Sequence, residues 1–284
     1  MFDGISPSDA AAAPSPRLQR ASGCIRLGFR RADGGNALST LFQQGSAKAR
    51  FPKVPAGLPP EAVIINTAGG LTGGDHFTID VAVAAGAAAT ATTQACEKVY
   101  RSAAGAAAVE TVLRLEPGAR LDWLPQETIL FDRGQLVRQV SVDMAADATL
   151  LAAESVIFGR TARGESVRQG LWRDRWRIRR DGRLLFADCT TLEGALSDVL
   201  RRPAVLAGGC AMATIVYVAP DAAPALAALR TCLEASPAEA GASTRDGLLV
   251  ARIAAADGAA LRATLISAFA ALRGDRPMPR VWLC

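Results

Sequence analysis

The stretch Asn66-Thr67-Ala68-Gly69-Gly70-Leu71-Thr72-Gly73-Gly74-Asp75 separates two segments that have the character of β-strands. The segment 62–65 before it is a short apolar run, and in the segment 77–83 after it apolar residues alternate with polar or small ones. Alternation with a period of two is typical of a strand with one buried face. We call the stretch 66–75 the glycine loop and predict that it connects two strands.

The glycines of this loop, Gly69, Gly70, Gly73 and Gly74, permit positive φ angles and close approach to other backbone. The loop lacks a phosphate-binding pattern, because Asp75 stands where a lysine would neutralise phosphate, and its spacing does not match a dinucleotide fingerprint. Two interpretations remain open. Asp75 accepts hydrogen bonds from backbone amides within a turn, or it is a fixed carboxylate that faces a cavity or a partner.

The length and composition favour a globular protein. A chain of 284 residues can bury a substantial core, in one large domain or two modest ones. No run of about 18 uncharged apolar residues occurs, so we predict no membrane-spanning helix. The first residues lack the basic and apolar regions of a secretory signal, and none of the 6 cysteines forms a Cys-x-x-Cys pair. We therefore expect a cytoplasmic protein with reduced cysteines.

A single histidine, His76, restricts the chemistry that the chain can perform. Metal cages built from several imidazoles are excluded, because they need more histidines than the chain has. A hydrolase or transferase would have to use Asp75 and His76 with a neighbouring hydroxyl such as that of Thr72. Adjacent residues on a strand point to opposite faces, which is poor geometry for such a pair. The hydrolase or transferase therefore stays an alternative.

The chain is predicted to be mainly β, with helices near its C-terminus. Residues 1–17 are rich in alanine, proline and serine and are predicted to be disordered. Residues 18–205 carry many short strand patterns separated by turn residues, which indicates an antiparallel β scaffold. Residues 206–284 alternate strand and helix patterns, with two predicted helices at 222–234 and 258–272. The two parts are expected to form one continuous domain.

A row of basic residues lies at 173–179. Arg173, Arg175, Arg177 and Arg179 alternate there with Trp172, Trp176 and Ile178. A basic nucleic-acid-binding β module is one interpretation of arginines interleaved with aromatics. We favour a strand with buried aromatics and solvated arginines, because the two kinds of residue fall on opposite faces.

Two charged residues interrupt apolar strand patterns. Arg138 lies on the apolar face of the segment 136–142, where nothing in the sequence explains it. Glu154 lies within the nearly continuous apolar run 150–158, and an ionised carboxylate is costly to bury there unless a polar group faces it. The alternatives for Glu154 are a strand edge or a pair with Arg160 or Arg163.

Several segments taken together have a recognisable order. The most distinctive are Asn66-x-x-Gly-Gly-x-x-Gly-Gly-Asp75 and Thr92-x-x-Ala95-x-x-Lys98-x-Tyr100-Arg101-Ser102. Trp123-Leu124-Pro125-Gln126-Glu127, Phe158-Gly159-Arg160 and Pro279-Arg280-Val281-Trp282 follow. The chain resembles the urease accessory protein UreD family, also called UreH, from about residue 22 to its end.

The resemblance implies a mainly β, helix-like stack of strands with two helices, which serves as a non-enzymatic scaffold in urease maturation. It implies that the scaffold binds UreF, which recruits the GTPase UreG, in a dimeric assembly that docks on the urease apoprotein. It further implies that nickel passes transiently through an internal hydrated passage, with no permanently bound cofactor. The net charge of +5 leaves room for an acidic protein partner, while neither nucleic acid nor membrane is expected.

The resemblance also implies roles for individual residues. Asp75, Glu154 and Glu97 are expected to contact nickel in transit, and a further family acid aligns at Ala187, beside which this chain has Asp188. The residues expected to form the passage or the loop are Gly69, Gly70, Gly73, Gly74, Thr92, Thr93 and Asp188, and those expected to face a partner or support the structure are Lys98, Tyr100 and Arg101. Because carboxylates and hydroxyls bind Ni²⁺ more weakly than imidazole and thiolate, sparse acids suit transit better than storage.

Overall fold

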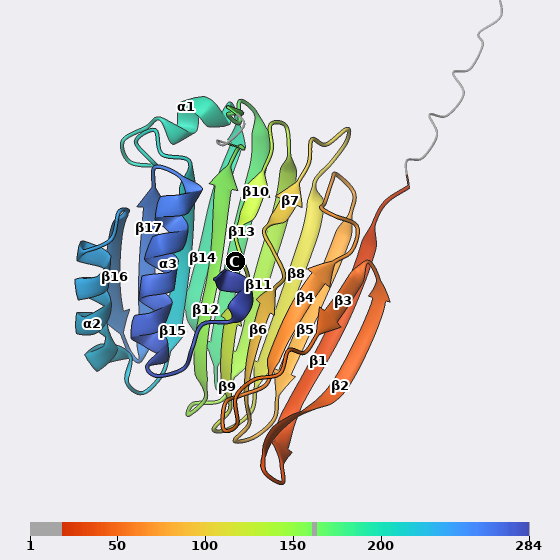
Figure 1. Ribbon diagram of the computed structural model, residues 1–284. Helices are drawn as coiled ribbons and strands as arrows, with labels where there is room; N and C mark the ends of the chain where they lie inside the picture. Colours follow the sequence, from red (N-terminus) through yellow and green to blue (C-terminus); the bar gives the residue numbers. More distant parts are fainter. Residues whose placement is uncertain (1–18, 161–163, 284) are drawn as a thin grey trace, which may run out of the picture.

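The computed structural model describes residues 19–160 and 164–283, and its strands form two sheets that face one another (Figure 1). The segment 1–17, predicted to be disordered, lies outside the described residues. The first sheet, called sheet A, has 7 strands and the second, sheet B, has 10.

The strands of sheet A follow one another in space in the order β14 (Arg183–Gly194), β13 (Gly170–Arg180), β11 (Gln135–Met144), β8 (Ala107–Leu115), β5 (His76–Val83), β1 (Ser22–Ala32) and β2 (Gly35–Gly45). The main path of sheet B is β16 (Glu239–Arg245), β17 (Leu248–Ala255), β15 (Ala211–Val218), β12 (Thr149–Phe158), β9 (Arg120–Leu124), β6 (Ala88–Thr93), β4 (Glu61–Asn66) and β3 (Ala47–Arg50). Two short strands, β10 (Thr128–Leu130) and β7 (Glu97–Val99), branch from β12.

The chain moves back and forth between the sheets as it advances. Strands β4, β6, β9 and β12 belong to sheet B, and strands β5, β8, β11 and β13, which alternate with them along the chain, belong to sheet A. Each pass adds one strand to each sheet, so neighbours within the centre of a sheet run parallel. The result is a stack of coils resembling a β-solenoid, which confirms the mainly β, stacked architecture.

The predicted antiparallel arrangement is wrong for the centre of the stack and correct only near its ends. Antiparallel pairs join β1 to β2 and β13 to β14 in sheet A. In sheet B they join β3 to β4, and β12, β15, β17 and β16 in succession. A short turn between two strand patterns suggests a hairpin. In the stack, however, such turns lead from one sheet to the other. Two parallel neighbours in one sheet are therefore connected through a strand of the opposite sheet, which serves as the crossover that parallel strands require.

The space between the sheets is filled by the main hydrophobic core. In β5 the buried residues Phe77, Ile79, Val81 and Val83 alternate with more exposed ones, as the period of two predicts. In β13, Trp172, Trp176 and Ile178 are buried while Arg175, Arg177 and Arg179 are exposed, which confirms the two-faced strand. Strand β12 is buried on both faces, because Leu150 faces this core and Leu151 faces a second one. That double burial explains its continuous apolar run.

Helices cover the far side of one end of sheet B. The helices α2 (Ala222–Glu234) and α3 (Gly258–Arg273) pack on β15, β16 and β17 and enclose the second core (Figure 1). Both predicted helices are confirmed, and a short additional helix, α1 (Leu196–Leu200), follows β14. Among the described residues, no helix combines the length and apolar character needed to cross a membrane.

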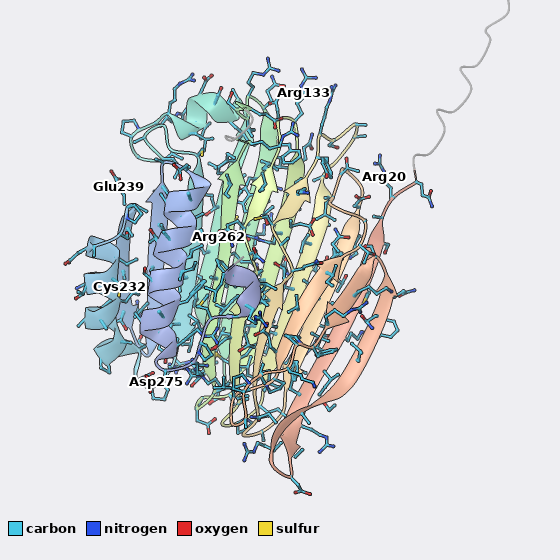
Figure 2. The ribbon with its side chains drawn as sticks, in the orientation of Figure 1. Arg20, Arg133, Cys232, Glu239, Arg262 and Asp275 are labelled. Atoms are coloured by element: carbon cyan, nitrogen blue, oxygen red, sulfur yellow. The ribbon has the colours of Figure 1, made fainter. Side chains whose placement is uncertain are left out.

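The C-terminal segment is fastened to the outer face of sheet B through Trp282, in the 3₁₀-helix η2 (Arg280–Trp282). The Trp282 indole Nε1 donates to the Leu124 carbonyl at 3.0 Å, and its ring packs edge-on against Phe269 with 5.3 Å between the centroids. Arg262 of α3, labelled in Figure 2, lies over the same indole and donates to Glu127 Oε2 at 2.6 Å. The chain end, α3 and β9 are thereby joined.

Replacing Trp282 with alanine should lower the free energy of unfolding by about 3–5 kcal/mol, because it empties a buried site and removes one of the two side-chain donors to the Leu124 carbonyl. Urea titration followed by circular dichroism measures the loss. Leu283→Ala is the matched control, since that side chain is 67% exposed and its loss should have little effect. A Trp282→Ala variant as stable as the control would show that the contacts of Trp282 do not stabilise the fold.

Candidate functional site

The glycine loop and the segment 98–102 form one unit. The Leu71 amide donates to the Lys98 carbonyl at 2.7 Å, and the Tyr100 amide donates back to the Leu71 carbonyl at 2.8 Å. The Tyr100 hydroxyl donates to the Gly69 carbonyl at 3.2 Å. At Gly70, where φ is +149°, a Cβ would lie 2.4 Å from the Tyr100 ring, and at Gly73 it would lie 1.9 Å from Ser102 Oγ. The two most distinctive sequence segments are thus parts of a single close contact.

Asp75 stabilises this loop from within. Its Oδ1 accepts the Ala21 amide at 2.8 Å and its Oδ2 accepts the Thr72 amide at 2.8 Å, and the residue is only 4% exposed. These contacts match the interpretation of Asp75 as an acceptor within a turn. Asp75 does not line either of the two inter-sheet cavities described below, and its contact with nickel stays a prediction.

His76 lies on the opposite side of the backbone from Asp75. It is exposed, and its Nε2 contacts the Thr78 hydroxyl at 3.1 Å. The buried carboxylate and the exposed imidazole therefore do not form the pair that a hydrolase or transferase would need.

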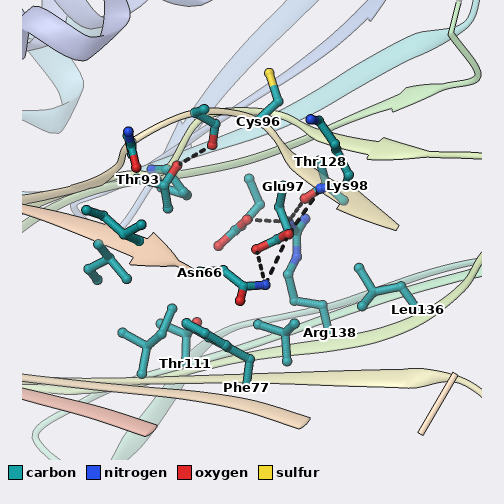
Figure 3. A pocket seen from close by; sticks show the side chains of 18 of the residues that line it. Asn66, Phe77, Thr93, Cys96, Glu97, Lys98, Thr111, Thr128, Leu136 and Arg138 are labelled. Carbon is teal, nitrogen blue, oxygen red and sulfur yellow. Dashed lines mark hydrogen bonds and ion pairs between the residues drawn. The ribbon is translucent and has the colours of Figure 1, made fainter. Parts of the chain in front are cut away.

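A cavity of about 210 Å³ lies between the sheets, next to the glycine loop (Figure 3). Its lining includes five of the residues predicted for the site: Gly69, Thr93, Glu97, Lys98 and Glu154. Thr92 is not among them, because its hydroxyl is buried within sheet B and donates to the Leu124 carbonyl at 2.6 Å. We call this space the first cavity.

Glu97 presents a carboxylate near one end of the first cavity. Asn66 Nδ2 donates to its two oxygens at 3.3 and 3.2 Å, and the Lys98 amide donates to Oε1 at 3.1 Å (Figure 3). Burial raises the pKa of Glu97 to about 7, and these hydrogen bonds only partly oppose the effect. Both the protonated and the ionised form of Glu97 are therefore populated near neutral pH.

Cys96, beside Glu97, also lines the first cavity. Burial and the neighbouring Glu127 carboxylate raise the pKa of its thiol to about 11. The free thiol is consequently protonated near neutral pH, so it must lose its proton before it can bind a metal ion as a thiolate.

Glu154 meets a buried arginine from the opposite sheet. It points inward from β12 and forms an ion pair with Arg138 of β11, while Trp123 Nε1 donates to its Oε1 at 2.9 Å. Arg138 Nε and Nη2 donate to the two Asp174 oxygens at 3.0 Å each. Trp176 Nε1 donates to Asp174 Oδ2 at 3.3 Å.

The members of this cluster, Arg138, Glu154 and Asp174, are 4%, 4% and 7% exposed. Burial raises the pKa of Glu154, and the Arg138 guanidinium opposes the rise. The cluster explains the charge at position 138 that the sequence left unexplained. It also corrects the predicted partners of Glu154, since Arg160 pairs with Glu165 and Arg163 lies outside the described residues.

A second cavity, of about 430 Å³, begins at the same cluster. Arg138 and Glu154 line both cavities, and Asp174, Thr190 and Arg252 line only the second. Asp188 of β14 reaches Arg252 of β17 across the sheets, with Oδ2 at 2.7 Å from Nη2, whereas Ala187 is exposed. The acid that faces sheet B on this strand is therefore Asp188.

Sequence reasoning did not select Asn66, Arg138 or Asp174 as site residues. Asp174 had a usable signal, because it shares the inward side of β13 with Trp172 and Trp176. A charge on a buried strand face requires a partner, and Arg138 was such a partner on another strand. The described part of the chain contains no group of three or more His, Cys, Asp or Glu side chains that could hold a metal ion.

Glu97→Gln should stabilise the protein at pH 8 relative to wild type, with the difference vanishing near pH 4. The raised pKa means that the folded state holds the Glu97 proton more tightly than the unfolded state, whose value is near 4.5. Wild type therefore loses stability as the pH rises from about 4.5 to about 7, by about 3 kcal/mol, and the glutamine variant does not. Urea unfolding across this range measures the difference, with Glu110→Gln, on an exposed position of β8, as the control. A pH-independent difference would contradict the raised pKa.

Comparison with known proteins places this architecture in a family. The family model described as "UreD urease accessory protein" matches residues 21–283. A protein of Azorhizobium caulinodans named "Urease accessory protein UreD" is 46% identical over 95% of this chain and 99% of the relative. Proteins of Rhizobium rhizogenes and Methylorubrum populi, named "Urease accessory protein UreD" and "Urease accessory protein UreD 2", are 49% and 47% identical over 95% of this chain, covering 98% and 92% of those relatives. The chain belongs to the UreD family of urease accessory proteins.

Proposed function

We propose that this chain acts in the maturation of urease as a scaffold that passes nickel ions and catalyses no reaction of its own. Membership of the UreD family supports the role in urease maturation. The observation that carries nickel passage is the pair of cavities between the sheets, which share Glu154 in their linings. Nickel is the cargo in this proposal.

The donors around the first cavity suit an ion that must leave again. Glu97 and Glu154 offer carboxylates at separate positions, with Thr93 nearby. The Cys96 thiol would retain Ni²⁺ only as a thiolate, and its raised pKa disfavours that form. A Ni²⁺ ion would bind one carboxylate at a time and keep most of its water ligands.

The proposal extends to the assembly implied by the family resemblance. The chain would bind UreF, reach UreG through UreF, and dock on the urease apoprotein in the cytoplasm as part of a dimeric complex. Asp75, Thr92 and the glycine loop would serve this scaffold by maintaining its shape, because their contacts are to the protein's own backbone.

Replacing Glu97 and Glu154 together with glutamine should lower the nickel content of urease matured with this chain several-fold, because an amide binds Ni²⁺ more weakly than a carboxylate does. Nickel per urease active site is measured by elemental analysis after purification from cells grown in limiting nickel. Co-purification of the accessory proteins shows whether the assembly is intact.

The matched control is Glu193→Gln, on an exposed position of β14 outside both cavities, which should leave the nickel content unchanged. Full nickel content with the double variant would contradict the passage. Loss of the complex itself would assign Glu97 and Glu154 to folding or docking instead.

A further inference from the structure

One basic and one acidic residue line both cavities. Arg138 and Glu154 are the two residues that belong to both linings, so these side chains lie where the two cavities adjoin. The Arg138 guanidinium lies between two carboxylates, Glu154 from sheet B and Asp174 from sheet A. We propose that Glu154 and Asp174 form a divalent-cation site that the Arg138 guanidinium occupies, so that Arg138 closes the route until it moves aside. This inference rests on the proposed function.

The charge of the cluster favours exchange of the guanidinium for a divalent cation. When both acids are ionised, the two carboxylates and one guanidinium sum to −1, all in buried positions. A doubly charged cation in place of the guanidinium brings the sum to zero. Because a buried uncompensated charge is costly, the exchange offsets part of the cost of displacing Arg138.

Each carboxylate also accepts a hydrogen bond from a residue other than Arg138. The Trp123 indole fixes Glu154 through Oε1, at 2.9 Å, and the Trp176 indole contacts Asp174 Oδ2 at 3.3 Å. A carboxylate oxygen can accept more than one interaction, so both groups retain capacity for a metal ion. Two buried acids, each with one indole hydrogen bond, therefore remain when the guanidinium leaves.

Arg138 must open the route by movement, because a guanidinium does not lose its proton in proteins. Its closed position is held by the bidentate contact to Asp174 and by the Trp172 ring, which lies 4.8 Å from the guanidinium carbon. The second cavity, at about 430 Å³, gives the side chain space to turn into. A hydrated Ni²⁺ in the first cavity would repel the guanidinium in that direction.

The decisive variant is Arg138→Gln in the full-length chain, titrated with NiCl₂ by calorimetry. We expect one Ni²⁺ site that binds about tenfold or more tightly than any site in wild type, because the competing cation is gone. Ni²⁺ should also raise the melting temperature of this variant, since a ligand that binds only the folded state stabilises it. Adding Asp174→Asn to the variant should abolish the site.

Arg114→Gln is the matched control, because it removes an arginine that pairs with Asp80 outside both cavities. It should gain no Ni²⁺ site. Should Arg138→Gln fail to fold, Arg138→Lys keeps the charge but loses the bidentate fork, and it should bind Ni²⁺ more tightly than wild type. Wild-type Ni²⁺ affinity in a folded Arg138 variant would overturn the proposal and leave the cluster a purely structural ion pair.

These outcomes separate the inference from the proposed function. Tight Ni²⁺ binding by Arg138→Gln, combined with normal urease loading by the Glu97 and Glu154 double variant, would support the cation site and reject the passage. Reduced loading by the double variant, combined with no gain of binding in Arg138→Gln, would support the passage and reject the occupied site.

Discussion

The alternation of successive strands between two sheets is the constraint on which the interior depends. Because strand β11 belongs to sheet A and β12 to sheet B, residues close in the chain face one another across the core. Arg138 and Glu154 meet in this way, and β13 then returns to sheet A and places Asp174 beside Arg138 in register. Three consecutive strands thus build the whole charged cluster.

The cluster of Arg138, Glu154 and Asp174 places buried charges next to the hydrophobic core. Buried ion pairs contribute little net stability when they replace apolar packing, since desolvation cancels most of the attraction. Here the indoles of Trp123 and Trp176 supply hydrogen bonds to the two acids, and the Trp172 ring covers the guanidinium. These contacts offset part of the cost of burying three charged side chains where the two cavities adjoin.

The sequence predicted the kinds of elements better than their arrangement. Period-two patterns identified β5 and β13, and helical spacing identified α2 and α3, because burial on one side leaves a local signature. Strand direction was missed because it depends on which sheet a strand joins, and that information is not local. For the same reason Glu97 and Glu154 could each be predicted as site residues from the sequence. Arg138 and Asp174 could be assigned to the site only from the contacts that the two sheets create.

The contacts that the C-terminal segment makes with sheet B affect the order in which the protein can fold during synthesis. Each coil needs only the preceding coil to pair with, so the stack can grow as the chain emerges from the ribosome. The middle of sheet B, however, receives its outer partners very late: Leu124 from Trp282, 158 residues further on, and Asp122 from Arg276, 154 residues further on. The fully buried Asp122 carboxylate therefore remains open to water until the segment that carries Arg276 has been synthesised.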